Sequence, residues 1–154
     1  MESQIQIIKS LIEAMLEKLS VAGEIEILED TECVQFVIKT KEAGLLIGEN
    51  GQNLHALSHL LKRITENEFK KNNLERIQFL LDVNGYQAKR IEEIKNLARM
   101  HAQRVRYFKK EIMMDPMNSY ERRIVHSVLT EYPDIITESS GEEPNRCVVV
   151  KLFL

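Results

Sequence analysis

Two successive series of helix-like and strand-like hydrophobic patterns constrain the fold of this 154-residue chain more than any other feature of its sequence. The apolar residues within 1–83 predict the order helix, strand, strand, short helix, helix, strand. After residue 83 the predicted order is helix, strand, helix, strand, strand. We therefore predict an α+β fold with two small domains, residues 1–83 and 84–154, joined by a long helix at about residues 85–108.

The limits of each element follow from the spacing of its apolar residues and from turn or capping residues at its ends. In the first domain we predict a helix within 3–19, strands at 24–28, 33–39 and 76–83, a short apolar turn at 43–47 and a helix that includes 54–64. In the second domain we predict a short strand within 110–114, a helix that Asn118 and Glu121 begin with a capping box, and strands at 135–138 and 147–153. The long helix carries an apolar seam of Ile91, Ile94, Ala98, His101, Val105 and Phe108.

The basic residues are concentrated in the middle of the chain, although the whole chain has a formal net charge of −3. Residues 84–126 hold 10 Lys and Arg against 5 Asp and Glu, whereas residues 1–83 hold 9 against 14 and residues 127–154 hold 2 against 5. Lys95, Arg99 and Arg106 fall on one flank of the predicted long helix. Because local potential determines where a polyanion binds, this segment is a candidate nucleic-acid surface. The alternative is a solvated helix face.

Gly48-Glu49-Asn50-Gly51 stands between the short apolar turn and the amphipathic helix that follows. Two glycines three residues apart let the backbone turn tightly and approach a ligand without a Cβ in the way. The free amides at a helix N-terminus also favour a phosphate. The motif resembles the loop with which KH domains clamp about four nucleotides. Glu49 would repel a phosphate, so the alternative is a loop that contacts another protein.

Arg122 and His126 lie one helical turn apart on the helix that follows Asn118. An arginine offers a planar fork of donors to a phosphate, and a histidine donates to a phosphate or stacks on a base. An ordinary polar helix face would show the same spacing, so the surrounding residues carry the argument. They are PMNSYERRIVH at 116–126 and ESSGEEPNR at 138–146.

These two stretches resemble the RxxxH domain, a module that binds single-stranded nucleic acid and is named for its Arg and His. With the GENG loop before them, the chain resembles the bacterial Jag family, also called SpoIIIJ-associated proteins, over about residues 1–154. The resemblance implies a type II KH domain joined to an RxxxH domain, and RNA binding linked to control of cell elongation and division. It also implies a homodimer, or a heterodimer with a small KH-domain protein, formed through the KH surface.

The same resemblance assigns roles to individual residues. It matches Gly48 and Gly51 to the loop glycines, Arg122 and His126 to the pair that names the second domain, and Arg123 and Arg146 to the basic positions beside that pair. This sequence departs from the family pattern at Glu49, at Ser119 and at Cys147, where a basic residue, a proline and a second basic residue are usual. Many relatives carry an additional N-terminal domain, which we expect this chain to lack.

The sequence shows no pattern typical of an enzyme, a cofactor site or a metal centre. His55 and His59 have the spacing of zinc ligands, but no HExxH glutamate stands between them and no third ligand is evident, so we expect surface histidines. Cys33 and Cys147 lie in strand-like runs and are expected to be reduced and buried, as in a cytoplasmic protein. No apolar run approaches the ~18–20 residues of a membrane span, and the N-terminus does not resemble a secretory signal.

We therefore predict a cytoplasmic protein without a catalytic site, cofactor or metal that binds single-stranded RNA, with single-stranded DNA as an alternative ligand. The alternative function is a protein-interaction or dimerisation adaptor whose KH half does not bind RNA, which Glu49 and the acidic balance of residues 1–83 favour. The residues predicted to bind nucleic acid are Gly48, Glu49, Asn50, Gly51, Lys95, Arg99, Arg106, Arg122, Arg123, His126 and Arg146.

Overall fold

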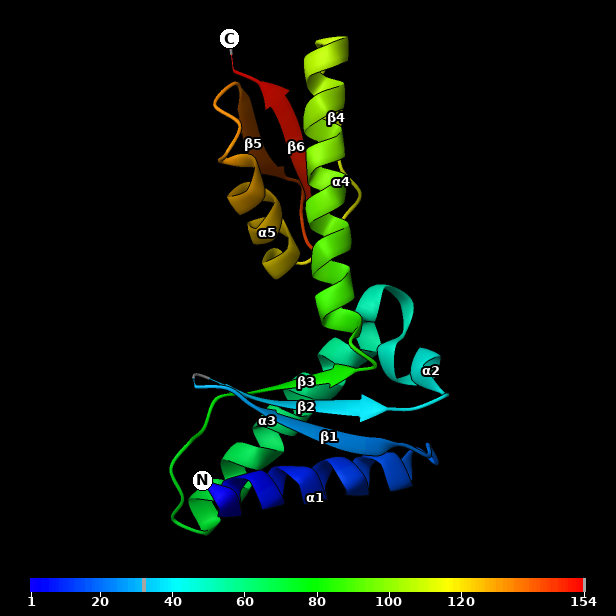
Figure 1. Ribbon diagram of the computed structural model, residues 1–154, viewed down its shortest axis with the longest axis vertical. Coiled ribbons are helices and arrows are strands. Elements are labelled where there is room, and N and C mark those ends of the chain that lie inside the picture. The colour runs from blue at the N-terminus through cyan, green and yellow to red at the C-terminus, as the bar shows by residue number, and fades with distance from the viewer. Residues whose placement is uncertain (32, 154) are drawn as a thin grey trace. The chain divides into compact units, whose positions relative to one another are not determined.

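The computed structural model describes residues 1–31 and 33–153 (Figure 1). The chain divides into two compact units, Met1–Gln87 and Ala88–Leu154. Helix α4 (Tyr86–Phe108) begins at the end of the first unit and continues in the second. The domain boundary expected after residue 83 stays a prediction. Among the described residues, no helix combines the length and the apolar character that crossing a membrane requires.

The first unit has the predicted order of helices and strands and forms a three-stranded sheet, in which β2 pairs antiparallel with β1 and parallel with β3. β3 begins at Phe79 and not at residue 76. Phe79 is the partner of Val34, the first residue of β2, and the carbonyl of Gln78 before it accepts a hydrogen bond of 3.1 Å from the Val34 amide. The elements are α1 (Glu2–Lys18), β1 (Glu24–Glu29), β2 (Val34–Lys39), α2 (Ala43–Ile47), the 3₁₀ turn η1 (Glu49–Gly51), α3 (Gln52–Lys71) and β3 (Phe79–Val83).

One face of this sheet packs against the helices, and the other face is more polar. Alternate residues of β2 and β3 point toward α1 and α3, as the period of a half-buried strand requires. On the opposite face Lys39 forms an ion pair of 2.7 Å with Glu26. The buried core consists of Ile5, Ile8, Ile12, Leu16, Val21, Val34, Phe36, Ile38, Leu46, Leu54, Leu61, Phe69, Phe79, Leu81 and Val83.

The second unit contains most of α4, then β4 (Ile112–Met113), α5 (Ser119–Leu129), β5 (Ile135–Ser140) and β6 (Cys147–Leu152). Its strands form a sheet of order β4-β6-β5, in which β6 is central and both pairings are antiparallel. Figure 1 shows α4 and α5 beside this sheet. Their apolar faces share one core with it, which includes Ile94, Ala98, Ala102, Val105, Val125, Val128, Leu129, Ile135, Val148 and Val150.

The predicted apolar seam of α4 is wrong at its last residue. Ile94, Ala98 and Val105 are buried, but Phe108 is 62% exposed. The buried residues follow the spacing of Ala98, Ala102 and Val105, which puts the next inward position at residue 109. There Lys109 has a φ of +56° just after the helix ends, so no further apolar residue enters the core from α4.

Candidate nucleic-acid interface

Helix α5 starts with the capping box that the sequence predicts. The Asn118 side chain accepts a hydrogen bond of 2.9 Å from the amide of Glu121, and the Glu121 carboxylate accepts one of 3.3 Å from the amide of Asn118. Glu121 is itself held by Arg90 of α4 at 3.0 Å. Fixing the first turn in this way orients Arg122 and His126, which follow it on the helix.

Arg122 is buried, and its guanidinium already has two partners. Nη1 donates a hydrogen bond of 2.8 Å to the backbone carbonyl of Met117, and Nη2 lies 2.9 Å from the carboxylate of Glu143. The Arg122 side chain is 11% exposed, whereas that of Glu143 is 60% exposed. Arg122 therefore joins the start of α5 to the β5–β6 loop, and Glu143 occupies the position at which an oxyanion would meet this guanidinium.

His126 contacts β5 through one ring nitrogen. Its Nδ1 lies 2.6 Å from the hydroxyl oxygen of Thr137. Burial lowers the pKa of His126 below its ordinary value of 6.5, and the charge of Arg122 lowers it further. The imidazole is therefore neutral at neutral pH. Within the described residues Nε2 has no hydrogen-bond partner, which leaves it for a ligand.

Arg146, the residue just before β6, lies in the same region at the end of the β5–β6 loop. Its Nε donates a hydrogen bond of 2.8 Å to the Ser139 hydroxyl, and its Nη1 donates one of 3.3 Å to the carbonyl of Gly141. These two bonds fix the guanidinium at the hairpin loop. Arg123 is different, because it is exposed on α5 and makes no ion pair among the described residues.

These side chains surround an open hollow of about 370 Å³. The guanidinium groups and the imidazole come from α5 and from the residue before β6, and hydroxyl groups complete the wall. The guanidinium and imidazole groups suit phosphate oxygens, and the Glu143 carboxylate is the acid in the same wall. The residues that line this space, which we call the RxxxH hollow, are Ser119, Arg122, Arg123, His126, Ser139, Glu143 and Arg146.

The GENG loop has the backbone geometry that its glycines predict. Gly48 has a φ of +72° and Gly51 a φ of +77°, a region that favours glycine. A Cβ on Gly48 would come within 2.5 Å of the Asn53 side chain, which donates a hydrogen bond of 2.8 Å to the carbonyl of Leu45. A Cβ on Gly51 would meet the ring of Tyr86 at 3.0 Å. The two glycines thus keep the loop tight against its supports.

Comparison with known proteins agrees with both motifs. The KH domain family matches residues 6–112, and the domain family whose name stands for an Arg and a His separated by three residues, the RxxxH domain, matches residues 92–152. A Bacillus subtilis protein named RNA-binding protein KhpB is 32% identical over 148 residues, which cover 95% of this chain and 69% of that protein. The chain belongs to the KhpB family. This confirms the predicted Jag family with its KH and RxxxH domains.

Other KhpB proteins resemble this chain over part of their length. The Clostridium symbiosum RNA-binding protein KhpB is 31% identical over 151 residues, and the protein of the same name from Lactiplantibacillus plantarum is 27% identical over 151 residues. Both alignments cover 98% of this chain, but they cover only 65% and 46% of those two relatives.

The cations predicted along α4 do not line the RxxxH hollow. Lys95 lies 3.6 Å from Glu92, and Arg99 donates to the side chain of Asn96 at 3.3 Å. Arg106 forms hydrogen bonds with both carboxylate oxygens of Asp134 and stacks on Tyr132 at 4.8 Å from the ring centroid. A role of Lys95, Arg99 and Arg106 in binding stays a prediction.

Sequence reasoning missed three contributors to the region around the RxxxH hollow. Thr137 and Ser139 are two residues apart on β5. Because alternate residues of a strand point to the same face, the sequence could have predicted that both side chains lie on one face of the sheet. Glu143 had no such signal, because its approach to Arg122 depends on the path of the loop.

The histidines and cysteines outside the hollow form no evident site. His55 and His59 are exposed on α3, as expected. Cys147 is buried, whereas Cys33 is only half-buried, and both thiols are free. Among residues 1–31 and 33–153, no group of three or more His, Cys, Asp or Glu is arranged to hold a metal ion.

Proposed function

We propose that this chain binds single-stranded RNA by seating the phosphate backbone in the RxxxH hollow. The observation that carries the proposal is the convergence of Arg123, His126 and Arg146 on one open site. The relatives named RNA-binding protein KhpB support RNA as the ligand, and single-stranded DNA is the alternative to be tested.

Each residue of the hollow has a distinct part in this proposal. Arg123 is exposed and meets the phosphate first. Arg146, already fixed by Ser139, presents the rest of its fork in a set orientation. His126 stacks on a base, or donates from Nε2 in the tautomer in which Nδ1 accepts a hydrogen bond from the Thr137 hydroxyl. Arg122 positions the site and meets a phosphate only when the Glu143 carboxylate moves aside.

The test is a fluorescence-polarisation titration of a labelled oligouridine with the wild type and with the double variant Arg123→Ala/His126→Ala. We expect the variant to bind at least about tenfold more weakly, because a hydrogen bond to a charged group contributes about 1.5–3 kcal/mol. Lys18→Ala, which removes an exposed charge from α1, is the control and is expected to bind like the wild type. Equal binding by the double variant would refute the proposal. A deoxyuridine oligonucleotide run in parallel decides between RNA and DNA.

The second candidate function is a protein-binding KH half. Glu49 is exposed in the GENG loop, and Leu45 and Leu60 on the flanking helices are 57% and 51% exposed. An acidic side chain repels a phosphate, and exposed leucine side chains are typical of a surface that binds another protein. Replacing Glu49 and Asn50 by aspartates separates the two ideas: a large loss of RNA affinity supports a nucleic-acid clamp, and unchanged affinity with an altered oligomeric state supports the protein contact.

The remaining expectations belong to the same proposal. We expect no catalytic activity, because the relatives are named for binding RNA. The link to cell elongation and division, the pairing with itself or with a small KH-domain protein, and the cytoplasmic location are implied by the family resemblance and stay predictions.

A further inference from the structure

The C-terminal end of α4 exposes two aromatic side chains in contact with each other. Tyr107 is 80% exposed and Phe108 is 62% exposed. Their ring centroids are 4.9 Å apart, and the ring planes meet at 82°. Neighbouring aromatic rings of this exposure leave a large apolar surface in water, which is uncommon unless a partner covers it.

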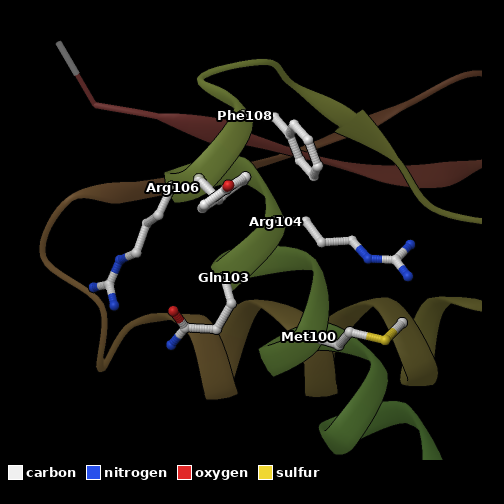
Figure 2. A pocket seen from close by; sticks show the side chains of 6 residues that line it. Met100, Gln103, Arg104, Arg106 and Phe108 are labelled. Carbon is white, nitrogen blue, oxygen red and sulfur yellow. The ribbon is translucent and has the colours of Figure 1, made fainter.

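An open hollow of about 620 Å³ lies along the same end of the helix. Figure 2 shows Met100, Arg104 and Phe108 projecting to one side of α4, one turn apart, and Gln103 and Arg106 projecting to the other side. Met100 is 41% exposed, so its thioether adds to the apolar floor beside the rings. The surface therefore alternates apolar groups with a guanidinium along one ridge of the helix.

The half of α4 that follows Glu93 carries basic charges only. No Asp or Glu occurs between Glu93 and Glu111, and Arg104, Lys109 and Lys110 are exposed. Asp134 is the acid on the other flank, where Arg106 donates a hydrogen bond of 2.8 Å to its carboxylate. That carboxylate is paired with Arg106, and it also interacts electrostatically with Lys109.

We propose that Met100, Arg104, Tyr107, Phe108, Lys109 and Lys110 form a stacking platform for the bases of a single-stranded RNA, separate from the RxxxH hollow. This inference rests on the RNA binding proposed above. Aromatic rings bordered by cations suit a single strand, because bases stack on the rings while the cations follow the phosphates. Aromatic residues, Met and Arg are also enriched in protein interfaces, but lysine is depleted there, so Lys109 and Lys110 favour a nucleic acid over a protein partner.

The hollow beside the platform and the RxxxH hollow share no lining residue. Arg90 pairs with Glu121, beside the hollow, and Arg106 pairs with Asp134, beside the platform. These two arginines are separated by about 24 Å along the axis of α4 at about 1.5 Å per residue. A short oligonucleotide therefore fills one site only, whereas a longer strand reaches both and gains affinity from the linkage.

The test uses the full chain and two readouts. In the first, labelled oligouridines of about 4 and about 16 nucleotides are titrated with the wild type, with Tyr107→Ala/Phe108→Ala and with the control Leu19→Ala, which removes an exposed apolar side chain from the end of α1. We expect the aromatic double variant to bind the longer strand about tenfold more weakly and the control to bind it like the wild type.

The second readout is the variant Tyr107→Trp, which keeps an aromatic ring and introduces a single tryptophan into a chain that has none. Oligouridine is expected to quench its fluorescence, and an abasic phosphate chain of the same length is not. This measurement reports the stacking of bases on the ring directly. It therefore tests the platform even if the alanine double variant is less stable than the wild type.

The outcomes separate this inference from the proposed function. Unchanged affinity of the aromatic variant together with an unquenched tryptophan overturns the platform, and the proposal for the RxxxH hollow stands if Arg123→Ala/His126→Ala still loses binding. A changed oligomeric state with unchanged RNA affinity also overturns it, in favour of a protein contact. If the wild type binds neither oligouridine, both proposals fail.

Discussion

Removing the charge of Glu143 is predicted to strengthen RNA binding. Its carboxylate lies 2.9 Å from Nη2 of Arg122 and faces the hollow in which we place a phosphate. Two anions then compete for one guanidinium, and a bound phosphate must displace the carboxylate or bind against its charge. The variant Glu143→Gln keeps the shape of the side chain and removes this competition.

The size of the effect follows from the distance and the exposure. For a phosphate charge about 6 Å from the carboxylate, Coulomb's law gives a repulsion of about 0.7 kcal/mol in water and about 2.8 kcal/mol at an effective dielectric constant of about 20. Glu143 is 60% exposed, so solvent screening places the result near the lower figure. We expect a gain of about 1 kcal/mol, which corresponds to about fivefold tighter binding.

The assay is a polarisation titration of oligouridine at two salt concentrations. Glu131→Gln is the matched control, because it removes the same charge from an exposed residue beyond the end of α5. The gain with Glu143→Gln is expected to exceed that of the control and to shrink at high salt. Affinity equal to the wild type, or weaker, would refute the view that Glu143 occupies the phosphate position.

Three further predictions concern stability and salt dependence. Arg122→Ala is expected to lower the free energy of unfolding by about 1–3 kcal/mol, because it removes a buried side chain and its hydrogen bond to the Met117 carbonyl. Arg123→Ala is the control and is expected to leave the urea denaturation curve unchanged. Arg123→Ala instead lowers the slope of log affinity against log salt by about one, since one phosphate contact is lost; an unchanged slope would exclude that contact. Burial lowers the pKa of His101 below 6.5, so the unfolded chain takes up this proton first and stability falls as pH drops through 6.5 toward the lowered folded pKa. Denaturation at several pH values is expected to show a flatter profile for His101→Gln, and an identical profile would contradict this.

The order of helices and strands could be predicted because each element keeps one hydrophobic period along its length. Val34, Phe36 and Ile38 alternate in β2 as the sequence indicates, and the capping box at Asn118 is visible in four consecutive residues. The ends were harder to predict. Phe108 has the spacing of a core residue, and only the path of the chain after α4 shows why it is exposed.

The candidate site divides in the same way. The spacing of Arg122 and His126 predicts that they share one face of a helix, because helical geometry is local. The burial of Arg122 and the approach of Glu143 depend on how the β5–β6 loop folds back, and no periodicity in residues 141–146 encodes that path. Long-range pairs such as Arg106 with Asp134 could not be predicted from the sequence either. Arg106, which the sequence predicts to bind RNA, forms a hydrogen bond with Asp134.

The most direct test of RNA binding by the RxxxH domain is a backbone amide NMR titration of the full chain with unlabelled oligouridine. We predict that the resonances of 119–126 and 139–146 shift first and saturate together, because these segments line the hollow. Shifts confined to residues 1–87, or no shifts at all at concentrations that saturate the polarisation assay, would contradict the proposal.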